Sequence, residues 1–161
     1  MSELFGGLAA ETKVETPEGG LTARTVAGKN ISVFTRDSQG RVRFRRVLNA
    51  RCVSENQPVV RVALESGESF RVAPDQILYK KGMSEARADA LQPGDELVPA
   101  FHYLEGYEYV DDETGSATIS KATIRVATVE AAGNSDLYTF GVNRTGNFFL
   151  SAGVLCKAEA A

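Results

Sequence analysis

The feature that most constrains this chain is a series of short segments in which apolar and polar residues alternate, separated by turn residues roughly every ten positions. The segments 59–65 and 68–73 flank a turn at Ser66 and Gly67, and 31–36 and 41–48 flank the hairpin signal Asp-Ser-Gln-Gly. Further strands are expected at 12–16, 95–100, 122–131, 136–142 and 147–155. Many short strands with frequent turns predict an all-β domain.

Helical patterns are rare in this sequence. The one expected helix is 84–92, with Ser84 as its N-cap and Pro93-Gly94 as its stop. The segment 101–120 breaks the strand rhythm because it is acidic, rich in turn residues and contains tyrosines. We expect it to be a surface insertion loop.

Length and composition predict one soluble domain that covers residues 1–161, with a net charge of −3. No apolar run is long enough for a membrane helix, and the start lacks the features of a signal peptide. The basic stretch 41–46 is better explained as the solvent face of a strand than as a nucleic-acid patch. Cys52 and Cys156 are expected to be buried strand cysteines in a reducing, cytoplasmic setting, and the single His102 argues against a metal site.

Three separated stretches resemble, in order, the motifs of the Hint (hedgehog/intein) family of self-splicing and self-cleaving domains. The first is GLAAETKVETPEG at 7–19, in which Gly7 stands where inteins have a cysteine. The second is APDQIL at 73–78, followed by LQPGDELV at 91–98. The third is the end of the chain, with LYTFGV at 137–142 and GNFF through GVLCKA at 146–158.

The resemblance implies a disc-like, all-β Hint fold whose first and last strands lie side by side, with Gly7, Gln76 and Lys157 converging. Residues 1–6 would then be an N-terminal flank and residues 159–161 a C-terminal flank. The implied partners are the flanking segments of a host protein at both ends. The implied domain is a monomer that needs no cofactor and binds neither nucleic acid nor membrane.

The family's chemistry requires side chains that this chain lacks. An acyl shift at the first junction needs a thiol or hydroxyl nucleophile and a general acid, and cyclisation at the last junction needs an asparagine. By resemblance, Cys156 is the remaining thiol near the C-terminal junction. The family's catalytic positions are occupied here by Gly7, Ala73, Gln76, Thr139, Gly146, Lys157 and Ala158.

Three functions therefore stay open at the level of sequence. The first is an intein-like autoprocessing domain in a disabled form, through natural divergence with one or two engineered changes such as those at Gly7 and Ala158. The second is a degenerate Hint-fold module with a binding or structural role. The third is an unrelated all-β interaction domain.

Overall fold

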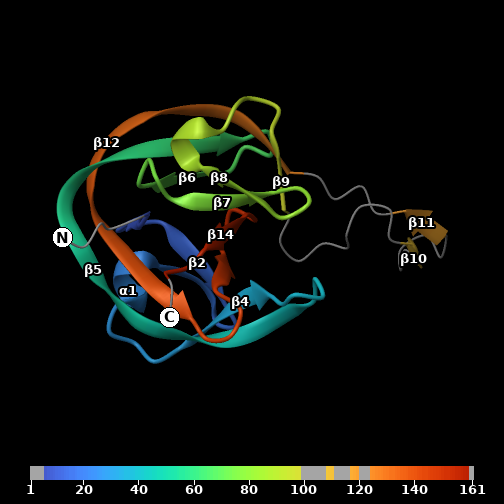
Figure 1. Ribbon diagram of the computed structural model, residues 1–161, viewed down its shortest axis with the longest axis horizontal. Helices are drawn as coiled ribbons and strands as arrows, with labels where there is room; N and C mark the ends of the chain where they lie inside the picture. Colours follow the sequence, from blue (N-terminus) through green and yellow to red (C-terminus); the bar gives the residue numbers. More distant parts are fainter. Residues whose placement is uncertain (1–5, 99–107, 111–116, 120–123, 160–161) are drawn as a thin grey trace.

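The computed structural model describes residues 6–98, 108–110, 117–119 and 124–159. Two long antiparallel strands, β5 (Val42–Leu64) and β12 (Ile124–Val142), pair along most of their length. In Figure 1 they curve around the left side of the body, and several of the shorter strands lie inside this curve. Both strands belong to a ten-stranded sheet whose order is β13-β14-β7-β9-β12-β1-β6-β5-β4, with β8 paired to β7. The all-β prediction is confirmed.

The predicted hairpins form where turn residues interrupt the alternating pattern. Strand β4 (Ser32–Arg36) pairs with the start of β5 across the Asp-Ser-Gln-Gly turn. Strand β6 (Ser69–Val72) pairs with the end of β5 across the turn that contains Gly67, at φ +94°. A separate two-stranded sheet joins β2 (Lys13–Thr16) to β3 (Gly19–Thr22).

The apolar members of these alternating strands form one main core. Val62 and Phe70, which are cross-strand partners on β5 and β6, are both buried. Phe140 and Phe148 pack at 4.6 Å between ring centroids and bring the late strands into the same core. Burial of such side chains contributes about 1.5–3 kcal/mol each, so this core supplies the main driving force for folding.

The helix predicted at 84–92 is wrong. Residues Ser84–Arg87 form strand β8, which pairs with β7 (Ile77–Lys80), and Ala88–Ala90 form the short 3-10 helix η1. Pairing with β7 overrides the local helix preference because it satisfies the backbone groups of this segment along a strand edge. The described α-helix is instead the single turn α1 (Ala23–Val26), whose N-cap is the Thr22 side chain.

The prediction for Cys52 is also wrong, since this residue is exposed. Ser54 lies opposite Leu137 whereas Cys52 lies opposite Tyr138, so Val53 is an extra residue in the β5 ladder. Such a bulge changes which residues face the core. Val53 packs inward and Cys52 points to solvent.

Several expectations concern residues that the structure describes only in part. Within 101–120, β10 (Glu108–Val110) pairs with β11 (Ala117–Ile119). The rest of that segment, including His102, lies outside the described residues. Within the described ranges, no helix has the length and apolar character needed to cross a membrane.

Four short strands position the two ends of the chain. Strand β1 (Leu8–Ala9) lies between β12 and β6, and β14 (Leu155–Lys157) lies between β13 (Asn147–Phe149) and β7. Strand β9 (Glu96–Leu97) pairs with both β12 and β7. The first and last strands are therefore not hydrogen-bonded neighbours, in contrast to the prediction, but their ends meet through a side chain of an intervening turn.

Candidate functional site

The side chain that contacts both ends of the chain is that of Gln76, the last residue of a β-turn between β6 and β7. The turn runs from Ala73 to Gln76, with Pro74 at its second position, and the Gln76 N–H donates to the Ala73 carbonyl at 3.0 Å. The Ala88 N–H of η1 donates to the Gln76 carbonyl at 2.9 Å and so packs η1 against the turn. These contacts hold the Gln76 side chain inside the protein, where it is 4% exposed.

The Gln76 side-chain amide joins the two junctions that the sequence suggested. Its Oε1 accepts a hydrogen bond from the Gly7 N–H at 2.8 Å. Its Nε2 donates to the Lys157 carbonyl at 2.9 Å and to the Ile77 carbonyl at 3.0 Å. The predicted convergence of Gly7, Gln76 and Lys157 is therefore present in the structure.

The backbone of the N-terminal junction is held on both sides. The Gly6 N–H donates to Asp75 Oδ1 at 3.1 Å, and the Gly7 carbonyl accepts from the Ala73 N–H at 2.9 Å. Together with the Gln76 contact, these bonds fix the peptide that joins Gly6 to Gly7. Asp75 was not among the predicted site residues, although its place in the APDQ turn is a signal that could have found it.

Both glycines adopt backbone conformations that L-amino acids rarely take. Gly6 has φ +78° and Gly7 has φ +136°. A Cβ atom at Gly6 would lie 2.6 Å from Gln76 Oε1, and one at Gly7 would lie 3.1 Å from the Leu137 Cβ. The local backbone is therefore shaped for glycine at both positions.

The C-terminal junction is held in a similar way. The Ala158 N–H donates to the Gly146 carbonyl at 2.9 Å, while Gln76 binds the carbonyl on the other side of the same peptide. Gly146 has φ +68°, which also favours glycine. The Lys157 ammonium group forms an ion pair with Glu85 of β8, at 3.1 Å, on the protein surface. No sequence motif around Glu85 predicted this contact.

The backbone carbonyl that precedes Thr139 lies near the N-terminal junction. The Tyr138 carbonyl, which is bonded to the Thr139 nitrogen, would lie 3.6 Å from a Cβ atom at Gly7. On β12, Thr139 is the cross-strand partner of Arg51. The structure thus places the peptide between Tyr138 and Thr139 near the N-terminal junction.

Cys156 is completely buried, as predicted. Its ladder partners are Phe148 on β13 and Leu78 on β7. Burial raises the pKa of the Cys156 thiol far above its usual range, because the charged thiolate would lose its hydration. A thiol in this environment remains protonated at neutral pH and is a poor nucleophile.

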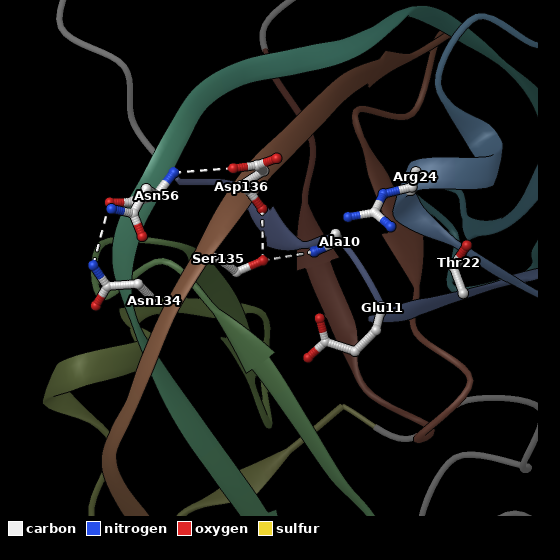
Figure 2. Close-up of a pocket in the computed structure, with 8 residues that line it drawn as sticks. All are labelled: Ala10, Glu11, Thr22, Arg24, Asn56, Asn134, Ser135 and Asp136. Carbon is white, nitrogen blue, oxygen red and sulfur yellow. Dashed lines mark hydrogen bonds between the residues drawn. The ribbon is translucent and has the colours of Figure 1, made fainter.

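A hollow of about 460 Å³ lies beside the end of β1 rather than at the junctions. Figure 2 shows how its polar groups bond to one another. Ser135 Oγ accepts from the Ala10 N–H at 3.1 Å, and the Asn56 N–H donates to Asp136 Oδ1 at 3.0 Å. The first bond attaches the residue after β1 to β12, and the second joins β5 to β12. Within the described part of the chain, no group of three or more metal-binding side chains comes together.

The sequence matches no family model and no curated protein. Solved structures give a clearer result. A variant of the Ssp DnaB mini-intein superposes with a TM-score of 0.78 at 10% identity, over 100% of this chain and 99% of that one. The DnaB intein from Synechocystis sp. PCC 6803 gives 0.73 at 10% identity, over 96% and 99% of the chains.

A bacterial intein-like domain from Clostridium thermocellum gives a TM-score of 0.70 at 18% identity, over 96% of this chain and 99% of that one. At such low sequence identities the similarity shows a shared fold and nothing more. It covers nearly all of this chain and of each similar structure. This chain has the hedgehog/intein (Hint) fold.

Proposed function

We propose that this chain is an intein-like self-splicing or self-cleaving domain whose reacting groups have been replaced, so that it stays intact as written. The observation that carries this proposal is the Gln76 side chain, which binds the Gly7 N–H and the Lys157 carbonyl at the same time. A Hint domain needs both junctions at one place, and here both meet at the uncharged amide of Gln76.

At the N-terminal junction, an acyl shift would require a nucleophile on residue 7 and an acid near its nitrogen. Gly7 has no side chain. Gln76 accepts a hydrogen bond from the Gly7 N–H, and an amide does not titrate near neutral pH. The position therefore keeps the contact with the junction nitrogen but cannot deliver a proton to it.

At the C-terminal junction, cleavage would require an asparagine side chain to attack its own carbonyl. Ala158 lacks such a side chain, and the residue is buried, with a relative exposure of 8%. The Lys157 ammonium group is paired with Glu85 at the protein surface, at 3.1 Å. The segments that flank residues 7 and 158 are the partners of this proposal.

Structural features at Gly7, Gly146 and Gln76 support natural divergence at these three positions. Gly7 and Gly146 both have a positive φ, so the surrounding structure is adapted to glycine rather than to a cysteine or histidine at those places. Gln76 makes three hydrogen bonds, which use both amide protons and the carbonyl oxygen, and these bonds indicate an amide that the fold accommodates. The same observation favours the second candidate, a Hint-fold module with a purely structural or binding role.

Restoring the nucleophile distinguishes these candidates. We expect the variant Gly7→Cys, fused to an N-terminal carrier protein, to release the carrier after Gly6 in the presence of thiol, as followed by mass spectrometry. Gly7→Ala is the matched control, because it introduces the same backbone strain and the same contact with Leu137 without a thiol. The unmodified chain is expected to stay intact under the same conditions.

The role of position 76 is tested by adding Gln76→His to Gly7→Cys. General acid–base assistance is typically worth about 10²–10⁴-fold, so cleavage should accelerate by roughly that factor. Absence of thiol-dependent cleavage from both variants, with the fold retained in circular dichroism, would favour the structural module. Equal rates in the two variants would show that Gln76 does not occupy the position of the acid.

A further inference from the structure

Arg51 and Glu159 form an ion pair directly after the candidate C-terminal junction. Arg51 Nη1 donates to Glu159 Oε2 at 2.8 Å, and Nη2 donates to Oε1 at 2.8 Å. The guanidinium is itself oriented by a bond from Nη1 to the Asn49 carbonyl at 2.8 Å. Two parallel bonds of this kind recognise the planar carboxylate more specifically than a single contact does.

The backbone of the same residue is held by β12. The Glu159 N–H donates to the Phe140 carbonyl at 3.0 Å, and Glu159 forms a parallel bridge with Gly141. Phe140 lies opposite a bulge in β5, because Thr139 pairs with Arg51 and Gly141 pairs with Leu48, which leaves Asn49 and Ala50 together across from Phe140. The Phe140 carbonyl therefore accepts the bond from Glu159 at an irregular point of the β5–β12 ladder.

These two contacts have different selectivity. The bond to the Phe140 carbonyl accepts any residue with a backbone N–H, as in strand addition to a sheet edge. The bidentate contact with Arg51 requires a carboxylate. Arg51 also holds the pKa of the Glu159 carboxyl below its usual range, so this group is charged at neutral pH.

We propose that Arg51 and the Phe140 carbonyl form a receptor for the segment that follows Ala158, and that this receptor selects a carboxylate at position 159. The ligand is an acidic peptide segment, here the chain's own. The inference is independent of the junction chemistry proposed above, because it uses only contacts made by residue 159. Failure of cleavage in the Gly7→Cys variants would leave it unaffected.

The test is amide hydrogen exchange at residue 159, measured by NMR on the full chain and on variants at that position. The ion pair of Arg51 and Glu159 is partly exposed, so its loss in Glu159→Gln should make amide exchange at residue 159 roughly two- to fivefold faster. Protection of the amide of residue 159 should be highest with Glu at this position and should fall through Asp and Gln to Lys. The charge-swapped double variant Arg51→Glu/Glu159→Lys should be better protected than Glu159→Lys alone.

Glu85→Gln is the matched control, because it also replaces a paired glutamate with glutamine. The partner of Glu85 is Lys157, which lies two residues before Glu159 in the sequence. It should leave exchange at residue 159 unchanged. Raising the salt concentration to 1 M should reduce the difference between the parent chain and Glu159→Gln, since exposed charges are screened. Equal exchange in Glu159→Gln and Glu85→Gln, or no recovery in the charge swap, would overturn the proposal.

Discussion

Replacing Gln76 with alanine removes in one change the side chain that joins the two junctions. Three hydrogen bonds are lost, to the Gly7 N–H and to the Ile77 and Lys157 carbonyls. Each contributes a net stabilisation of about 1 kcal/mol, so the expected loss in the free energy of unfolding is about 3 kcal/mol. The loss is large because Gln76 is 4% exposed, which leaves its former partners without easy access to water.

Urea unfolding measures this loss directly. With a denaturant slope of about 2 kcal/mol/M, the midpoint for Gln76→Ala should fall by about 1.5 M. The matched control is Gln92→Ala, which removes a glutamine at an exposed position and should shift the midpoint very little. If the two variants unfold at the same urea concentration, Gln76 does not connect the junctions and our account of the site is wrong.

Histidine at the same position gives a second, graded result. A neutral imidazole has one acceptor and one donor, which match the Gly7 N–H and the Lys157 carbonyl. We therefore expect Gln76→His to lose only the bond to Ile77, at a cost of about 1 kcal/mol. A loss as large as that of alanine would show that the imidazole cannot reach both junctions.

Three further predictions concern the surroundings of this site. Gly6→Ala should destabilise the protein by about 1–3 kcal/mol in thermal unfolding, and by more than Gly28→Ala, because both glycines have φ +78° but only Gly6 would place its Cβ against a neighbouring atom. Iodoacetamide should label Cys52 in the folded protein and Cys156 only after denaturation, as read by mass spectrometry; labelling of both in the folded state would contradict the burial of Cys156. The folded-state pKa of Glu159 is lowered, so its contribution to stability is present above the ordinary glutamate pKa of about 4.3 and is lost as the pH falls through the lower folded value. The difference in urea midpoint between the parent chain and Glu159→Gln should therefore shrink in acid, and a difference that grows in acid would refute this assignment.

Much of the strand content could be predicted because it depends on neighbours in sequence. The alternation in 59–65 and 68–73 specifies which face of each strand is buried, and Ser66-Gly67 permits the tight turn between them. The same local signals led to the error at 84–92. There the helix preference is weaker than the pairing of β8 with β7, a contact that the sequence window does not contain.

The face of an individual residue was harder to predict where the ladder is irregular. Cys52 was expected to be buried, but the extra residue at Val53 turns it toward solvent. A bulge depends on how two distant strands register with each other, and a shift of one residue reverses the face. Cys156 escaped this error because its short strand lies between β13 and β7 in the interior.

The sequence by itself determined the all-β class and the main hairpins, and it singled out the candidate residues at both ends of the chain, because periodicity and ordered motifs are properties of the linear chain. Only the tertiary structure decided how those positions interact. The Gln76 bond to Gly7 spans 69 residues, its bond to Lys157 spans 81, and the pair of Arg51 and Glu159 spans 108. No local pattern encodes such contacts, since each depends on where the curved β5 and β12 strands and the intervening turn bring the ends of the chain.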